Sequence, residues 1–243
     1  MNLPAVVAIA FGASLLGSVS GSSSSMITTP AWVTLGASFP VAVAADKVAG
    51  TFWTVVAART YLARGRLDRR LLLGMGITGL LGAAGGALLA TALDERVLRR
   101  GAGVLILGAI LLSLVPRPAA APGGVGDRPP SAAGWGFPLG VYEGVLGSGN
   151  AILTTVLLQR TRGWDLLVAV GHYYALAAMW CALAAVMYIW RGAFDPTLTL
   201  AATLGSIGGG ALGARLGRIH GSAVVRPLFI LAGTVLALLL LFG

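Results

Sequence analysis

Two short polar stretches interrupt an otherwise apolar sequence, and their residue types are suited to binding an anion. The first reads GSVSGSSSSMITTP over residues 17–30, and the second reads GSGNAI over residues 147–152. Serine hydroxyls donate hydrogen bonds, and the amides at a broken helix's N-terminus carry partial positive charge. We expect the two breaks to form facing walls of an anion site, although the same residues could only pack helices. The candidate binding residues are Ser22, Ser23, Ser24, Ser25 and Thr28 in the first stretch and Gly147, Ser148, Gly149 and Asn150 in the second.

Ionisable residues inside apolar segments are the second candidate for chemistry. The one lysine, Lys47, follows Asp46 in AVAADKVAG, while Glu143 lies in GVYEGVLGSG and His172 in VAVGHYYAL. A charge at such depth costs about 2.5 to 3.5 kcal/mol on insertion scales, so it indicates a functional site. We expect Lys47 to bind the anion and Glu143, with His172 and Asp46, to couple transport to protons.

These residues also have purely structural interpretations. Asp46 and Lys47 could neutralise each other, Glu143 could accept hydrogen bonds from local amides, and a single histidine on an apolar face is often only a buried core residue.

Composition predicts that the chain resides in a lipid bilayer. Of its 243 residues 57% are hydrophobic and 10% charged, and the mean hydropathy is +0.88. The apolar residues fall in long runs, at 71–93, 101–115, 166–189, 197–216 and 223–242, which match the thickness of the hydrocarbon layer. The net charge of +9 does not indicate nucleic-acid binding, because the arginines flank the runs and form no continuous basic face. We expect a multi-pass protein of the bacterial cytoplasmic (inner) membrane.

Single residues of other types carry less information. The one cysteine, Cys181, excludes an internal disulfide, and it is expected to be a small buried hydrophobe. No metal site and no cofactor are predicted. Aromatic residues near the proposed span ends are expected to anchor the protein at the membrane interface; these are Trp32, Trp53, Tyr61, Trp135, Trp164 and Trp190.

The chain reads as two copies of one pattern, offset by about 126 to 127 residues. Gly82 and Gly86 fall on Gly209 and Gly213, ARGRLD (63–68) falls on WRGAFD (190–195), and the two polar breaks coincide. Rows of small residues at every fourth position allow two membrane helices to approach closely. The expected domains are a first transmembrane repeat over 1–115, a Pro/Gly-rich linker over 116–133 and a second repeat over 134–243.

The predicted fold is an all-α polytopic membrane protein of two inverted repeats. Each repeat has a re-entrant, broken helical hairpin followed by three transmembrane helices, because the flanks of the second break are too short to cross separately. An odd number of crossings per repeat inverts the second copy. With the N-terminus outside, twelve arginines fall inside and four outside, as the positive-inside rule requires.

The sequence resembles the TauE/SafE family of bacterial permeases, also called the sulfite exporter family. GVYEGVLGSGNA (140–151) resembles the family's second-half motif G-F-Y-D-G-F-F-G-P-G-T-G, and AADKVAG matches its first-half lysine at Lys47. The family's first glycine cluster is serine here, and its second-half lysine is replaced near Tyr174.

The resemblance implies secondary transport of small anions such as sulfite, thiosulfate or organosulfonates, with export as the expected direction. The expected partners are a small anionic substrate and the lipid bilayer, and the sequence leaves a homodimer open. A passive anion channel and an intramembrane enzyme acting on lipid head groups, with Asp46, His172 and Glu143 as acid and base, are the alternatives.

Overall fold

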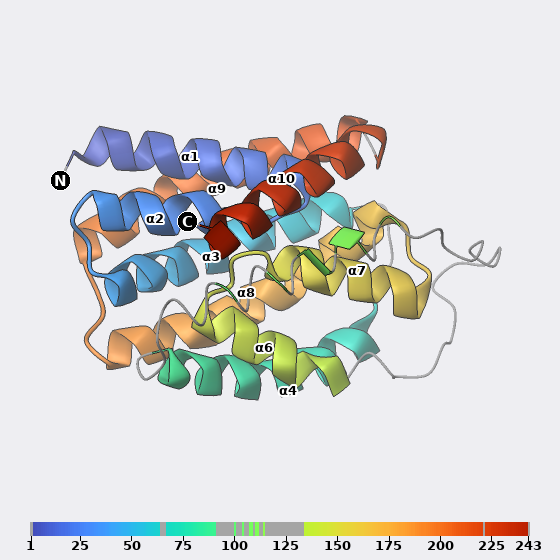
Figure 1. Ribbon diagram of the computed structural model, residues 1–243, viewed down its shortest axis with the longest axis horizontal. Helices are drawn as coiled ribbons and strands as arrows, with labels where there is room; N and C mark the ends of the chain where they lie inside the picture. The colour runs from blue at the N-terminus through green and yellow to red at the C-terminus, as the bar shows by residue number, and fades with distance from the viewer. Residues whose placement is uncertain are drawn as a thin grey trace.

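The computed structural model describes residues 2–63, 67–90, 134–220 and 222–242, together with a few positions between 100 and 114. Over these ranges every regular element is an α-helix (Figure 1). The helices are α1 (Leu3–Ser20), α2 (Ser25–Thr34), α3 (Phe39–Tyr61), α4 (Arg69–Leu89), α6 (Gly136–Val145), α7 (Asn150–Arg162), α8 (Leu166–Trp190), α9 (Pro196–His220) and α10 (Ser222–Phe242). The predicted linker over 116–133 lies outside the described residues, so the proposed domain boundaries stay a prediction.

Helix length separates possible membrane spans from shorter elements. Among the described residues, five helices are long and apolar enough to cross a bilayer, namely α1, α3, α4, α8 and α9. In contrast, α2 and α6 have 10 residues each and α7 has 13. At 1.5 Å per residue these three reach at most about 20 Å, which is less than the roughly 30 Å of hydrocarbon.

Both predicted breaks are present, and each lies at the tip of a helical hairpin. α1 and α2 run in opposite directions on either side of residues 21–24, and α6 and α7 do so on either side of residues 146–149 (Figure 1). The turns depend on glycines with positive φ, at +69° for Gly21, +70° for Gly147 and +83° for Gly149. Residues with a side chain rarely adopt this conformation, so these glycines fix where α1 and α6 end and where α7 begins.

The hairpins pack against helices from the opposite half of the sequence. α1 lies along α9, α6 lies along α4, and α3 packs against α8 in the centre. The predicted glycine rows lie on α4 and α9, where they form the contacts with α6 and α1. A Cβ on Gly209 would lie 2.0 Å from the carbonyl oxygen of Phe11, and a Cβ on Gly86 would lie 2.1 Å from that of Val141. The prediction that these rows allow close helix approach is therefore confirmed.

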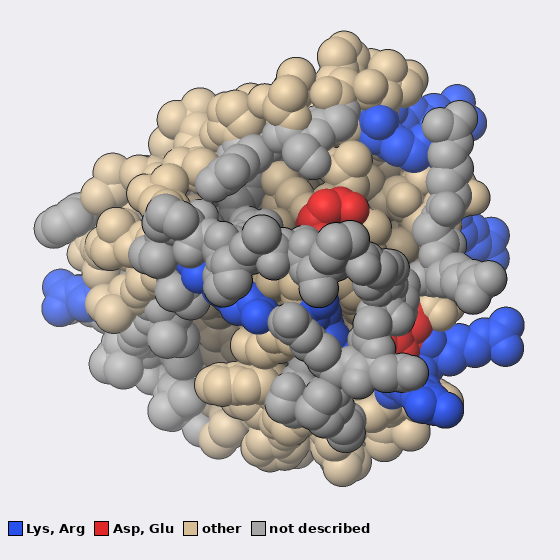
Figure 2. All heavy atoms as spheres, turned by 90° about the vertical axis from the view of Figure 1, so that its right-hand side faces the viewer, with Lys and Arg blue, Asp and Glu red and all other residues tan. Residues whose placement is uncertain are grey.

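Basic residues gather at one end of the bundle, the end that Figure 2 turns toward the viewer. At this end α3, α7 and α9 finish and α4 begins. Its described arginines are Arg59, Arg69, Arg70, Arg160, Arg162, Arg215 and Arg218. Arg191 lies at the opposite end, just after α8. Asp68 and Asp165 cap α4 and α8 here, each accepting a hydrogen bond from a backbone N–H three residues ahead.

The expectation of interfacial anchoring is wrong for four of the six aromatic residues. Trp32, Trp53, Tyr61 and Trp164 are buried, whereas Trp135 and Trp190 are 52% and 74% exposed. Trp32 donates to Asp46, and Tyr61 donates to the carbonyl of Ser18. Because these polar groups find partners inside the bundle, the rings do not need the membrane interface.

Candidate functional site

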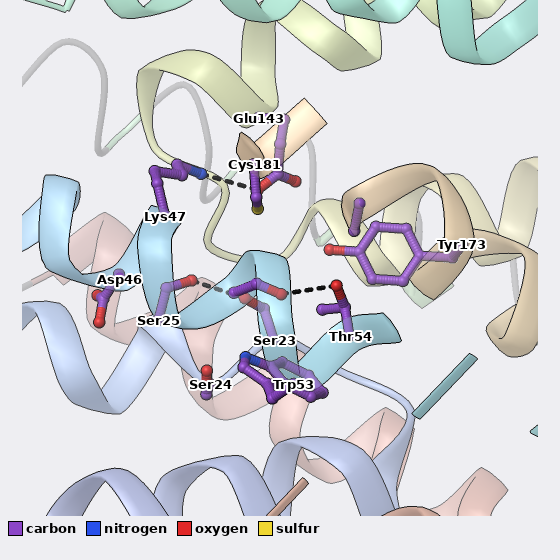
Figure 3. Close-up of a pocket in the computed structure, with 12 residues that line it drawn as sticks. Ser23, Ser24, Ser25, Asp46, Lys47, Trp53, Thr54, Glu143, Tyr173 and Cys181 are labelled. Carbon is purple, nitrogen blue, oxygen red and sulfur yellow. Dashed lines mark hydrogen bonds and ion pairs between the residues drawn. The ribbon is translucent and has the colours of Figure 1, made fainter. Parts of the chain in front are cut away.

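A small cavity lies at mid-depth between the two central helices, α3 and α8. Gly50 and Ala177, which line it, lie near the midpoints of these helices, and Ser23, Ser24 and Ser25 of the first break close one side (Figure 3). The remaining lining residues are Asp46, Lys47, Trp53, Thr54, Glu143, Tyr173 and Cys181. The cavity gives the centre of a water molecule about 20 Å³, so this conformation has room for a water-sized molecule and not for a larger solute.

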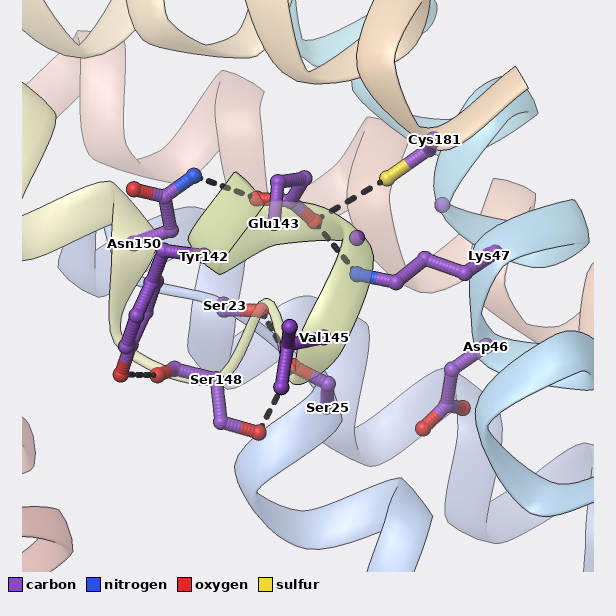
Figure 4. A network of polar contacts seen from close by, with 12 residues as sticks. Ser23, Ser25, Asp46, Lys47, Tyr142, Glu143, Val145, Ser148, Asn150 and Cys181 are labelled. Carbon is purple, nitrogen blue, oxygen red and sulfur yellow. Dashed lines mark hydrogen bonds and ion pairs between the residues drawn. The ribbon is translucent and has the colours of Figure 1, made fainter. Parts of the chain in front are cut away.

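The cavity contains a buried ion pair that joins the two halves of the chain. Lys47 Nζ lies 2.7 Å from Glu143 Oε1, and the two side chains are 3% and 4% exposed. Cys181 Sγ lies 3.3 Å from the same oxygen, and Asn150 Nδ2 donates to Oε2 at 2.7 Å (Figure 4). Both carboxylate oxygens of Glu143 are therefore hydrogen-bonded, so the charge is compensated in spite of its burial.

The second break is built around this pair. A Cβ on Gly147 would lie 2.2 Å from Lys47 Nζ and 2.6 Å from Glu143 Oε1, so any side chain here would displace the ion pair, and the positive φ also favours glycine. The two breaks also touch each other, because Ser148 Oγ donates to Ser25 Oγ at 3.2 Å (Figure 4). Ser23 Oγ in turn lies 2.6 Å from Ser25 Oγ. The predicted facing arrangement is thus present as a chain of hydroxyl contacts.

A tyrosine holds the first break from the opposite half. Tyr174 on α8 donates its hydroxyl to the carbonyl oxygens of Gly17 at 3.1 Å and Ser22 at 3.0 Å. The Gly17 carbonyl also accepts from the backbone N–H of Ser22 at 2.8 Å, so Tyr174 matters most for the Ser22 carbonyl, which would be costly to bury without a donor. Tyr174 therefore stabilises the first break with a neutral group, whereas Lys47 and Glu143 stabilise the second with charges.

The N-termini of two helices lie at the breaks. α2 starts after Ser24 and α7 starts after Gly149, and neither N-cap residue makes a side-chain capping hydrogen bond in the structure. No cap side chain therefore covers the first-turn amides, although those of Ile27 and Ile152 donate to the cap carbonyls of Ser24 and Gly149. Such amides add positive potential next to Lys47, and this favours a negatively charged ligand.

Asp46 does not pair with Lys47, so the interpretation of these neighbours as a neutralising pair is wrong. Its carboxylate accepts hydrogen bonds from Thr29 Oγ1 and from Trp32 Nε1, the latter at 2.9 Å, and both donors are on α2. Consecutive residues on a helix point about 100° apart, which directs Asp46 to α2 and Lys47 to the second break. Asp46 thereby ties α2 to α3 at the wall of the cavity.

His172 lies apart from the cavity, at the arginine-rich end of α8. Its Nε2 accepts a hydrogen bond from the backbone N–H of Asp68 at 3.0 Å, and its Nδ1 donates to the carbonyl of Val168 at 2.8 Å. The ring of Trp164 stacks on it at 4.2 Å between centroids. One nitrogen accepts and the other donates, so the imidazole is neutral. Its role in proton coupling stays a prediction.

The remaining predicted residues fall into two groups. Ser23, Ser24 and Ser25 line the cavity with Asp46, Lys47 and Glu143. The others form its supporting layer: Ser22 bonds to Ser20, Thr28 donates to the carbonyl of Ser24, and Asn150 orients Glu143.

The sequence analysis missed Trp53, Thr54, Tyr173 and Cys181 as cavity residues. A helical spacing could have indicated them, because Lys47, Gly50 and Thr54 share one face of α3. Cys181 is buried as expected, but its thiol faces Glu143 as well as apolar neighbours.

Comparison with known proteins identifies the family. The family model described as "Sulfite exporter TauE/SafE" matches residues 6–240. The chain belongs to the TauE/SafE family. It is therefore a multi-pass membrane transporter, as the motifs around Lys47 and Glu143 predicted. The "Probable membrane transporter protein ORF9" of Sinorhizobium sp is 27% identical over 239 residues, which cover 96% of this TauE/SafE chain and 89% of that protein. No solved structure matches the chain.

Proposed function

We propose that this TauE/SafE protein is a secondary transporter of small anions in the bacterial cytoplasmic membrane, with sulfite, thiosulfate or organosulfonates as substrates and export as the physiological direction. The observation that carries the proposal is the Lys47 ammonium, buried in a cavity at mid-depth between two broken hairpins. Broken helices that meet near the bilayer midplane are a common binding-site architecture of secondary transporters, because half-helix N-termini point at the anionic group.

The donor inventory of the cavity fits an oxyanion. An ammonium has three N–H donors, and among the described residues Glu143 is the hydrogen-bond partner of one of them. Two donors therefore remain for a ligand. The hydroxyls of Ser23, Ser24 and Thr54 line the same cavity and can turn toward an anion's oxygens.

The geometry favours a transporter over the two alternatives. A channel needs a continuous aqueous path, whereas this cavity has room for little more than a water molecule. An intramembrane enzyme would need Asp46, His172 and Glu143 to converge. His172 instead bonds to Asp68 and Val168, away from the cavity.

We also propose that the two halves are inverted repeats and that the arginine-rich end faces the cytoplasm. Matching contacts support the repeat: Tyr61 donates to the carbonyl of Ser18, and Tyr188 donates to that of Val145, and the partners are 43 positions apart in both cases. The α1–α2 hairpin and the α6–α7 hairpin also enter the bundle from opposite ends (Figure 1). The positive-inside rule supports the orientation.

Flux measurements in proteoliposomes test the proposed function. The purified protein should move sulfite, thiosulfate, methanesulfonate or sulfoacetate saturably, and acetate poorly. The double variant Lys47→Met with Glu143→Gln removes the ammonium without leaving an unpaired charge, and it should abolish the flux. Arg191→Met is the matched control, because it removes a cation outside the cavity and should keep wild-type flux. Undiminished flux in the double variant would contradict the proposal.

A further inference from the structure

We propose that Glu143 occupies the anion's place on Lys47 in the empty transporter, and that a monovalent anion replaces it when Glu143 takes up a proton. Transport would then move one anion and one proton together without net charge. This inference rests on the proposed function and deepens it, because it specifies the charge of the substrate and the group that couples its transport to protons.

The Glu143 carboxylate is held by donors from three other helices. Glu143 lies on α6, yet its two oxygens accept from an ammonium on α3, a thiol on α8 and an amide on α7 (Figure 4). These are the donors that a bound oxyanion would use. Lys47 has two further N–H donors, but an anion bound to them beside an ionised Glu143 would place two negative charges on one buried cation.

The net charge of the buried site stays at zero through the proposed cycle. With Lys47 and Glu143 both ionised, the buried pair sums to zero. If a proton from the open side adds to Glu143, the hydrogen bond from Lys47 to Oε1 is lost and the ammonium bonds to the anion, which keeps the sum at zero. On the other side the anion leaves, the proton dissociates and the ion pair forms again. Both states cross the low-dielectric interior without an unpaired charge, which would be costly there.

The charges around Glu143 also restrict the charge of the anion that the site can bind. The ionisable groups around Glu143 are Lys47 and Asp46 on α3, Tyr142 on its own helix, and Tyr173, Cys181 and Tyr188 on α8; α7 supplies only the neutral Asn150. Lys47 is the one cation among these groups, and Asp46 is an acid. A dianion would leave one negative charge without compensation, so the site selects monoanions such as hydrogen sulfite and organosulfonates.

Coupling to an inward proton gradient constrains the direction of transport. Export of the anion proceeds only while its outward gradient exceeds the inward gradient of protons. This balance lets the protein remove an accumulating anion and then stop.

Methanesulfonate provides the decisive test, because it stays a monoanion over the physiological pH range and cannot carry the proton itself. Wild-type protein is reconstituted with a pH dye inside the vesicles, and the membrane potential is set with valinomycin and potassium. We expect one proton to enter with each methanesulfonate, and a gradient of one pH unit to change accumulation about tenfold. A step of 100 mV should leave accumulation unchanged, whereas movement of one charge would change it about 50-fold.

Two results would overturn the inference and leave the proposed function intact. One is accumulation that follows the voltage and ignores the pH gradient. The other is thiosulfate uptake as fast as that of methanesulfonate, since we expect the dianion to move at least tenfold more slowly. Absence of saturable flux for every anion of the panel would instead contradict the proposed function.

A substitution tests whether Glu143 carries the proton. In Glu143→Gln the empty site has a charge of +1 and the loaded site is neutral, so uptake should follow the voltage and lose its proton. Asp165→Asn is the matched control, because it also neutralises one acid but lies at the exposed cap of α8, where asparagine caps equally well. It should keep wild-type coupling. Proton coupling that persists in Glu143→Gln would assign the proton to another acid, such as Asp46, and overturn the proposal. If Glu143→Gln does not fold, the wild-type proton and voltage measurements still decide the inference.

Discussion

Replacing Lys47 with methionine tests how strongly the buried ion pair holds the protein together. The change removes the cation and leaves Glu143, whose side chain is 4% exposed, with Asn150 and Cys181 as its partners among the described residues. Because water does not screen the remaining carboxylate, the loss should fall in the range of about 3 to 5 kcal/mol found for half-broken buried pairs. For a chain of this size, 1 kcal/mol corresponds to about 2 to 4 °C, so Tm should fall by about 6 to 20 °C.

Thermal unfolding of the purified protein in detergent measures this shift. Adding Glu143→Gln to Lys47→Met should restore at least half of the lost Tm, because neither charge then remains. The reasoning would be refuted by a single variant within about 2 °C of wild type, or by a double variant no more stable than the single one.

Three further predictions concern packing, the first break and the cavity. Gly209→Ala should prevent stable expression, because its Cβ would lie 2.0 Å from the carbonyl oxygen of Phe11, whereas Gly85→Ala has no atom within 4 Å and should express normally in a fluorescence-detected chromatography assay. Tyr174→Phe removes the hydroxyl donor from the buried Ser22 carbonyl, so it should cost about 1 to 3 kcal/mol and lower Tm accordingly; an unchanged Tm would mean that water replaces the hydroxyl. Cys181 is the one cysteine of the chain and is buried at the cavity, so a charged maleimide should label it slowly, and a transported anion should slow the labelling further; mass spectrometry of the intact protein measures both rates.

The sequence predicted the positions of the breaks and the charges but not all of their partners. Glycine and serine clusters interrupt a helix by local chemistry, so residues 21–24 and 146–149 could be located without a structure. The glycine rows likewise identified helices that approach closely, because this property depends on side-chain size alone.

Partner choice depends on tertiary contacts and could not be predicted. Asp46 and Lys47 are neighbours in sequence, yet one bonds to α2 and the other to Glu143, which is 96 residues away. For the same reason, the burial of four aromatic residues could not be predicted. Burial of Trp53 depends on a facing glycine, Gly210, whose absent side chain leaves room for the ring.

The packing of each hairpin against a helix from the opposite half of the chain has a consequence for biosynthesis. α1 emerges from the ribosome long before α9, whose glycine row packs against it and which begins only at Pro196. During most of translation α1 must therefore wait in the bilayer, or against the translocation machinery, for its permanent neighbour. A nascent chain that stalls before α9 would display an uncovered hairpin, which membrane quality-control proteases could recognise. Final assembly of this transporter is thus expected to be late and post-insertional.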